Sequence, residues 1–175
     1  MNYQGCAWYF ITLCCERRHS VFANRQWAQR FVGCLENTAK KCHFSVHAYC
    51  VMPDHFHALV EGAAPACDLL LFVRILKQTS SREYSCESGA SLWQKKFYDH
   101  ILRPKDSPDA VSWYIWMNPV RKGLCSQLNE YPYSGSLTGQ WQLKAQPQNQ
   151  WIPTWKQESL GLDTNPAARA KSAAP

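Results

Sequence analysis

The sequence lacks the patterns that mark several common protein classes. It has no Cys-x-x-Cys pair, and its nine cysteines are scattered singly apart from the adjacent Cys14 and Cys15. Neither a disulfide framework nor a zinc ribbon fits that spacing. The apolar run from Cys6 to Cys15 is too short to span a bilayer, and no basic segment precedes it. We therefore expect reduced, mostly buried thiols in a soluble cytoplasmic protein with no membrane partner.

Three further motifs are missing. No HExxH pattern occurs, so a zinc hydrolase of that type is not indicated. No GxxxxGK[ST] phosphate loop occurs, and we expect no nucleotide cofactor. No Lys/Arg-Gly-Phe signature occurs either, which argues against an RNA-recognition module.

The composition suits one domain and permits a polyanionic partner. A chain of 175 residues with 46% hydrophobic content can bury a single core. The formal net charge is +6, and aromatic residues make up 13% of the chain. Basic residues interleaved with aromatic ones can hold phosphates and stack on bases, although large aromatic side chains are more often part of the core. A nucleic acid is therefore a candidate partner.

Hydrophobic periodicity predicts the order β-α-β-β-α-β. The strand segments are rich in β-branched and aromatic residues, and the helical segments place apolar residues three or four apart. We expect strands at 8–14, 44–51, 55–60 and 97–102, and helices at 25–41 and 67–84, with a serine- and glycine-rich loop over 85–91. This is the order of an α+β ferredoxin-like (RRM-like) sandwich, with an antiparallel sheet.

A further helix is expected from Pro108 to Asn118. Ser107 suits the N-cap, Pro108 the first helical position, and Asp109 the first turn. Pro119 disfavours helical geometry in the residue before it, so we expect the helix to end at Asn118.

The chain beyond residue 135 forms a C-terminal extension, 136–175, rich in Gln, Pro, Ser and Trp. Its last part, 163–175, is small and polar, and we expect it to be disordered. Trp141, Trp151 and Trp155 indicate that the rest packs on the domain or touches a ligand, and the pattern does not choose between the two.

Two histidines lie close together in one predicted strand. In a strand, His55 and His57 project from one face and Phe56 from the other. Their Cα atoms would lie about 6.6 Å apart, at ~3.3 Å per residue, so two imidazoles can converge on one metal ion. Two half-exposed structural histidines fit the same spacing. A zinc hydrolase is a weaker third interpretation, because no Asp-His continuation follows His57.

Tyr114 and Asn118 share one face of the predicted helix. They lie four positions apart, which brings their Cβ atoms to about 5–6 Å. One offers a phenol oxygen and the other a carbonyl oxygen that a hard divalent cation accepts. In isolation the pattern favours a half-buried tyrosine and a helix-ending asparagine, and Tyr84 and Tyr98 compete for any special tyrosine role.

These segments together resemble a known family. Met-Pro-Asp-His-Phe-His at 52–57, followed by Tyr-x-x-x-Asn-Pro-Val-Arg-x-Gly-Leu at 114–124, closely resembles the REP-associated tyrosine transposases. These are single-tyrosine transposases of the HUH endonuclease superfamily. The resemblance runs from the Trp8 strand through Tyr131-Pro-Tyr-Ser and includes the basic segment at 92–97. The family usually has Asn where this chain has Asp54.

The resemblance implies a transposase domain over 1–135 in which the helix carries the catalytic residue. By position, His55 and His57 match the metal-binding pair, Tyr114 the nucleophile, and Asn118 the residue that assists the metal. The implied activity is metal-dependent cleavage and strand transfer of single-stranded DNA, through a 5′-phosphotyrosine intermediate. The implied cofactor is a divalent metal, Mg²⁺ or Mn²⁺.

The chemistry of these residues fits that activity. A phenol has a reference pKa of about 10, so Tyr114 needs its phenolate stabilised or its proton removed. A cation on the histidines can polarise a phosphate oxygen. The phosphotyrosine intermediate keeps a phosphoester bond to the DNA, and the rejoining step can use this bond. Strand rejoining therefore needs no nucleotide cofactor.

The partner that the resemblance implies is single-stranded or hairpin DNA, such as repetitive extragenic palindromes. The protein would act as a monomer or homodimer in the bacterial cytoplasm, on the nucleoid when bound to DNA. Each basic candidate for a backbone contact also fits a solvated surface charge, and these candidates are Arg17, Arg18, Arg74, Lys77, Lys95, Lys96, Arg103, Lys105, Arg121 and Lys122. The alternative function is a nucleic-acid-binding protein that keeps the fold without significant catalysis.

Overall fold

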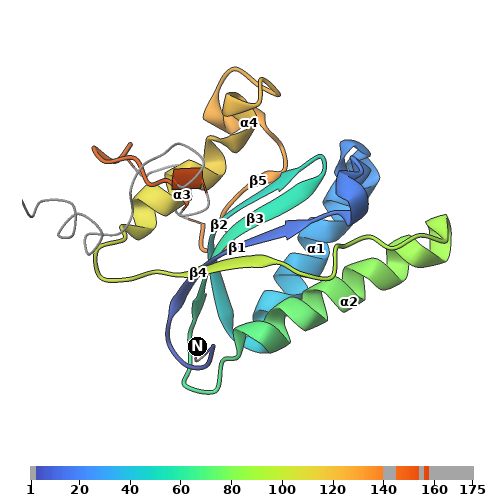
Figure 1. Ribbon diagram of the computed structural model, residues 1–175, viewed down its shortest axis with the longest axis horizontal. Coiled ribbons are helices and arrows are strands. Elements are labelled where there is room, and N and C mark those ends of the chain that lie inside the picture. The colour runs from blue at the N-terminus through green and yellow to red at the C-terminus, as the bar shows by residue number, and fades with distance from the viewer. Residues whose placement is uncertain (1–2, 140–144, 154–155, 158–175) are drawn as a thin grey trace, which may run out of the picture.

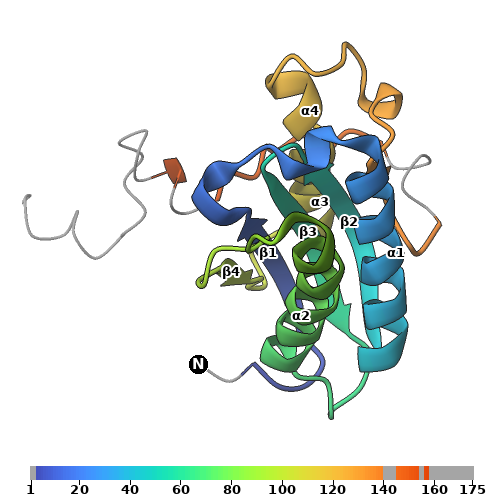
Figure 2. The ribbon, with the colours of Figure 1, turned by 90° about the vertical axis from the view of Figure 1, so that its right-hand side faces the viewer.

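A five-stranded antiparallel sheet forms the centre of the molecule (Figures 1 and 2). The computed structural model describes residues 3–139, 145–153 and 156–157. The sheet has the order β4-β1-β3-β2-β5, with β1 (Trp8–Cys14), β2 (Phe44–Met52), β3 (His55–Gly62), β4 (Tyr98–Ile101) and β5 (Ser134–Gly135). The first four strands have the ferredoxin-like order, which confirms the predicted α+β sandwich.

Helices cover both faces of this sheet (Figure 1). One face carries α1 (Arg25–Cys42) and α2 (Leu69–Ser88), and the other carries α3 (Pro108–Trp116), which continues into the short α4 (Asn118–Arg121). Three single 3₁₀ turns, η1 (Glu16–Arg18), η2 (Val21–Ala23) and η3 (Leu128–Glu130), complete the elements.

Each face of the sheet has its own core. Phe56 of β3 packs with Phe31 and Phe72 under α1 and α2, whereas Phe10 of β1 packs with Ile115 under α3. Because both faces are covered, β3 is buried along almost its whole length. This strand is therefore the one on which polar side chains can be held away from water.

The predicted end of α2 was wrong. The helix begins after Asp68, whose side chain accepts a hydrogen bond from the Leu71 N–H (3.0 Å), and it runs to Ser88 rather than to residue 84. The serines of the predicted loop are compatible with a helix when their hydroxyls bond back to it. Ser88 does so, donating to the carbonyl of Tyr84 (2.7 Å). Gly89, with φ of 68°, ends the helix in the left-handed conformation that glycine adopts at low cost.

The helix of the candidate tyrosine also differs from the prediction at its end. Ser107 caps α3 as predicted, accepting from the Ala110 N–H (3.3 Å). The helix ends at Trp116, two residues early, and the chain turns helical again as α4 in spite of Pro119. Proline is tolerated there because it occupies the first turn of α4, where its missing N–H has no helical partner.

The C-terminal extension is described only in part. Residues 145–153 and 156–157 lie on the α3 side of the sheet (Figure 1). The segment predicted to be disordered, 163–175, lies outside the described residues, as do Trp141 and Trp155.

All nine cysteines are free, as expected, but only four are buried, while Cys6 and Cys86 are exposed. Within the part of the chain that the structure describes, no helix has the length and apolarity to cross a bilayer.

Candidate active site

The two histidines of β3 face one another beneath the α3 side of the sheet. The Nε2 atoms of His55 and His57 are 3.0 Å apart, and the side chain of Phe56 packs on the other face against Phe31. The predicted same-face arrangement is confirmed. The two residues are not half-exposed, since only 8% of His55 and 3% of His57 is accessible.

The second nitrogen of each ring has a partner of its own. His55 Nδ1 lies 2.6 Å from a carboxylate oxygen of Asp54, and Asp54 is paired in turn with Arg18 (3.0 Å). His57 Nδ1 lies 2.8 Å from the hydroxyl of Thr12, the residue opposite it on β1. These contacts fix both ring orientations and leave the two Nε2 atoms converging on one point.

Burial keeps both imidazoles neutral. It lowers the pKa of His57 well below its usual 6.5, and the charge that a protonated His55 would carry lowers it further. Burial also lowers the pKa of His55, against the opposing influence of the Asp54 carboxylate. At neutral pH each ring therefore has one unprotonated nitrogen with a lone pair, which is the state that a metal ligand requires.

The pair fits a divalent ion that has few protein ligands. Two nitrogen atoms bound at right angles about 2.1 Å from an ion would lie roughly 3.0 Å apart, the separation of the two Nε2 atoms here. In the described segments, no group of three or more His, Cys, Asp or Glu side chains is arranged to hold a metal. An ion on this pair would need oxygen ligands from elsewhere.

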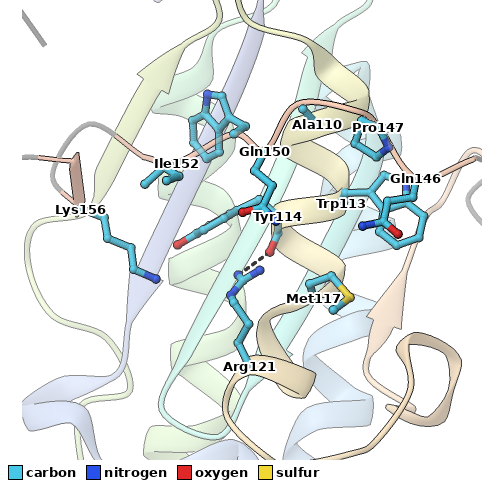
Figure 3. Close-up of a pocket in the computed structure, with 11 residues that line it drawn as sticks. Ala110, Trp113, Tyr114, Met117, Arg121, Gln146, Pro147, Gln150, Ile152 and Lys156 are labelled. Atoms are coloured by element: carbon cyan, nitrogen blue, oxygen red, sulfur yellow. Dashed lines mark hydrogen bonds between the residues drawn. The ribbon is translucent and has the colours of Figure 1, made fainter. Parts of the chain in front are cut away.

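Tyr114 projects from α3 toward the histidine pair. Its ring centroid lies 6.3 Å from that of His57 and 6.0 Å from that of Phe10, and 8% of the residue is exposed. Burial raises the pKa of the Tyr114 phenol, while the neighbouring Arg121 lowers it. The guanidinium carbon of Arg121 lies 4.4 Å from the ring centroid, and its Nη2 donates to the Tyr114 carbonyl (2.7 Å; Figure 3).

The competing tyrosines lie in different environments. Tyr84 belongs to α2 and packs its ring against Trp27, on the face of the sheet opposite to the histidines. Tyr98 belongs to the edge strand β4, shares the histidine face and contacts Phe10 with a centroid distance of 6.0 Å. Tyr114 is thus the one of the three whose ring pairs with His57.

Asn118 has a structural part at the break between α3 and α4. Its side-chain Nδ2 donates to the carbonyls of Tyr114 (3.0 Å) and Ile115 (3.3 Å). The second of these bonds replaces the one that Pro119, which has no N–H, cannot supply to the Ile115 carbonyl. These bonds favour the helix-ending interpretation, and the predicted role of Asn118 at a metal stays a prediction.

The C-terminal extension reaches the candidate nucleophile. Trp151 meets the ring of Tyr114 edge-on at a centroid distance of 5.3 Å and also packs on Phe10 at 4.9 Å. The indole of Trp113 donates to the carbonyl of Ala145 (2.9 Å), and Lys156 Nζ lies 5.8 Å from the Tyr114 ring centroid. Packing on the domain is therefore confirmed for Trp151, whereas Trp141 and Trp155 lie outside the described residues.

The predicted DNA contacts fall into separate groups. Arg18, Arg121 and Lys122 are near enough to the histidines for their charge to lower a histidine pKa. On the other side of the sheet, an open groove beside α2 is lined by Arg74, Lys77 and Lys95. Lys77 is engaged there, because its Nζ donates to the carbonyls of Gln94 and Lys95. The remaining candidates are exposed, and these are Arg17, Lys96, Arg103 and Lys105.

Sequence reasoning assigned no contact with the histidines or the tyrosine to four residues at this site. Thr12 and Asp54 hold the histidines, and Trp151 and Lys156 lie against the tyrosine. A lone threonine in the hydrophobic strand 8–14 is a signal that could have marked Thr12. The segment around Trp151 has no periodicity that would reveal its docking place.

The sheet, the histidine pair and the nearby tyrosine have the arrangement that the sequence resemblance led us to expect of a DNA transposase. A family model described as "Transposase IS200 like" matches residues 4–118, and the chain belongs to this family. Membership implies nuclease activity on DNA, and the HUH character of the family implies a metal ion.

Two relatives support this assignment, and one solved structure shares the fold. The chain is 26% identical over 132 residues to a REP-associated tyrosine transposase of Escherichia coli strain K12, covering 75% of this chain and 76% of that one. It is 25% identical over 138 residues to a Haemophilus influenzae protein named as a candidate transposase of the same kind, covering 72% and 77%. A REP-associated tyrosine transposase solved with a REP hairpin has the same fold, with a TM-score of 0.64 at 22% identity over 77% of this chain and 79% of that one.

Proposed function

We propose that this protein is a metal-dependent endonuclease and strand transferase that acts on single-stranded DNA beside a hairpin, with Tyr114 as the nucleophile. The observation that carries the proposal is the pairing of a buried phenol with two neutral imidazoles. The centroids of the Tyr114 and His57 rings are 6.3 Å apart, and His57 Nε2 lies 3.0 Å from that of His55. No other pair of histidines in the described residues is linked in this way.

Each residue then has a defined part in the reaction. His55 and His57 would hold a divalent ion, Mg²⁺ or Mn²⁺, and such an ion would withdraw charge from a phosphate oxygen. The Tyr114 oxygen attacks phosphorus, the bond from phosphorus to the 3′-oxygen breaks, and a 5′-phosphotyrosine and a 3′-hydroxyl remain. The phenol loses its proton to solvent, and the departing 3′-oxygen takes one up.

Arg121 makes the attack possible at a lower pH than burial alone would allow. Burial raises the pKa of Tyr114, whereas the guanidinium beside the ring favours the phenolate. The bond from Arg121 to the Tyr114 carbonyl fixes the cation in that place. Arg121 therefore acts as a positioning residue for the nucleophile.

Several observations support hairpin DNA as the substrate. The chain has a formal net charge of +6, and four cations, Arg18, Arg121, Lys122 and Lys156, lie near enough to influence the histidines. A relative of the same fold was solved with a REP hairpin. A phosphate in a flexible single strand can also approach a tyrosine at the sheet surface more easily than one in a duplex.

The decisive experiment is incubation of the protein with end-labelled hairpin DNA that has single-stranded flanks, in the presence of Mn²⁺. A covalent protein–DNA species should form with the wild type. Tyr114→Phe should bind the DNA with near-native affinity and form no adduct, because it lacks only the attacking oxygen. His55→Ala and His57→Ala should lose metal-dependent cleavage and stay folded. Tyr98→Phe is the matched control and should cleave normally.

A second function, DNA binding without significant catalysis, is favoured by one observation. Trp151 packs edge-on against the Tyr114 ring, and little of that residue is exposed. If this is the true function, the wild type will bind hairpin DNA at all metal concentrations and never yield an adduct.

A further inference from the structure

A pocket beside Tyr114 is not used by the chemistry proposed above. It lies between α3 and the C-terminal segment and encloses about 280 Å³ (Figure 3). Its walls include Trp113, Tyr114, Arg121, Gln146, Gln150 and Trp151. The pocket thus joins the candidate nucleophile to a segment that the family model, which ends at residue 118, does not include.

The walls of this pocket combine three kinds of chemistry. Trp113 and Trp151 offer indole rings, against which a flat ring can stack. Gln146 and Gln150 are exposed amides, each with donors and an acceptor for the edge of a polar ring. Arg121 supplies a positive charge that solvent can reach.

The positively charged side chains that line the pocket favour an anionic ligand. Arg121 and Lys156 both line it, and none of its described lining residues is an Asp or a Glu. The two cations repel one another. Burial has the larger effect in lowering the pKa of Lys156, and the charge of Arg121 lowers it further. Among the described residues, Arg121 forms no ion pair with a carboxylate, and its recorded bond is to the Tyr114 carbonyl. The positive charge of Arg121 would attract a phosphate.

We propose that this pocket binds one unpaired nucleotide of the DNA, next to the phosphate that Tyr114 attacks. The inference rests on the proposed function and adds to it a protein site for a base. The base lies against the indoles with its edge toward the glutamines, and its phosphate lies toward Arg121 and Tyr114.

The size of the pocket suits a single base. A volume of about 280 Å³ lies just below the ~300–1,000 Å³ typical of small-molecule sites, so it has room for one base. A base within a duplex is also stacked on both faces, whereas an unpaired one can transfer its stacking to an aromatic side chain.

The test is an abasic scan of DNA binding by the full chain, with EDTA present so that no cleavage occurs. Labelled hairpin DNA with single-stranded flanks is prepared with one base removed at each flank position in turn. We expect one position, or two adjacent ones, to weaken binding of the wild type by about thirtyfold, the combined size of a lost base–aromatic stack and the hydrogen bonds at the base edge. All other flank positions should change affinity by less than about threefold.

Matched variants assign the effect to the pocket. The double variant Gln146→Ala/Gln150→Ala should bind the intact DNA more weakly than the wild type does. Removing the base at the sensitive position should then cost this variant less affinity than it costs the wild type, by a factor of at least about three. Gln148→Ala, also exposed and in the same segment but outside the pocket, should keep the full penalty. A flat scan, or an unchanged penalty in the double variant, would overturn the inference.

The result is separable from the proposed function. If the wild type forms a covalent adduct in Mn²⁺ while the abasic scan in EDTA is flat, the pocket inference fails and the proposed function stands. If the scan and variants behave as expected but no adduct forms, the pocket is a nucleotide site on a protein that only binds DNA. If hairpin DNA does not bind at all, both proposals fail.

Discussion

For single residues, the chemistry of the site depends on which nitrogen each histidine leaves free. Thr12 and Asp54 occupy the Nδ1 atoms, so His57 and His55 present Nε2 to one another. Partners of this kind fix the ring orientation of a metal-binding histidine and are worth about 10- to 100-fold in metal affinity. The side chain opposite His57 should therefore affect the metal without touching it.

Thr12→Val tests this dependence. The substitution keeps the shape of the side chain and removes the hydroxyl 2.8 Å from His57 Nδ1. We expect the Mn²⁺ concentration for half-maximal cleavage to rise by about tenfold, with DNA affinity in EDTA unchanged. Asp54→Asn, which keeps an oxygen for His55, is the control and should change the metal requirement less. If Thr12→Val cleaves DNA with the same metal requirement as the wild type, this hydroxyl has no part in the site.

The charge of Arg121 should appear in the pH dependence of cleavage. Its guanidinium lowers the pKa of the Tyr114 phenol, against the larger effect of burial, which raises it. Arg121→Met removes the charge, so the phenol pKa should rise and less phenolate should form at a given pH. The rise of the cleavage rate with pH should then shift to higher pH, so that the variant is slower than the wild type at a given pH below the phenol pKa. Lys122→Met is the control, and identical profiles for wild type and Arg121→Met would contradict the assigned role.

Among the secondary-structure elements, the break between α3 and α4 sets the position of the tyrosine. The Tyr114 carbonyl accepts from both Asn118 Nδ2 and Arg121 Nη2, so two side chains from beyond the break hold the helix that carries the nucleophile. Asn118→Ala should cost about 1–3 kcal/mol in the free energy of unfolding, measured with denaturant, because two buried carbonyls lose a partner.

The same variant tests the predicted metal role of Asn118. If its oxygen also assists the metal, Asn118→Ala should weaken apparent metal affinity in the cleavage assay more than it weakens DNA affinity. Normal cleavage at low metal, together with the loss of stability, would leave Asn118 as a helix-ending residue alone.

Most of the elements could be predicted because their periodicity is local. The strand 8–14 and the start of the helix at Arg25 follow from side-chain patterns alone. The end of α3 could not, because a proline both disfavours a helix before it and suits the first turn of the next. The contact of Thr12 with His57 depends on strand register, which is fixed by long-range packing rather than by either strand.

For the whole molecule, the positive charge should govern the strength of DNA binding. The formal net charge is +6, and the basic residues lie both beside the histidines and in the groove next to α2. Neutralising phosphates releases counterions, so the affinity for hairpin DNA should fall steeply and linearly in a plot of log affinity against log salt. A flat dependence would argue against a nucleic-acid partner.

The two basic regions can be distinguished by the same titration. Arg74→Ala/Lys95→Ala removes charge from the groove next to α2, and Lys122→Ala removes it near the histidines. The region whose loss reduces the slope of the salt plot is the one that contacts phosphates. The sequence could not separate these regions, since they come together only through the placement of α2, α4 and β4.

The placement of the C-terminal segment is likewise a property of the whole molecule. Trp151 meets Phe10 of β1 and Tyr114 of α3, two residues far apart in the chain, and no local pattern predicts that meeting. The sequence could identify the histidines and the tyrosine by motif, but it could not reveal what lies against them.

The central claim, that Tyr114 attacks the phosphate, is tested most directly by locating the covalent bond. Wild-type protein is trapped with hairpin DNA in Mn²⁺ and digested with nuclease and protease, and the modified peptide is sequenced by mass spectrometry. The account predicts a nucleotide on Tyr114 and none on Tyr84 or Tyr98. A nucleotide on any other residue, or cleaved DNA with no protein bound to it, would contradict the claim.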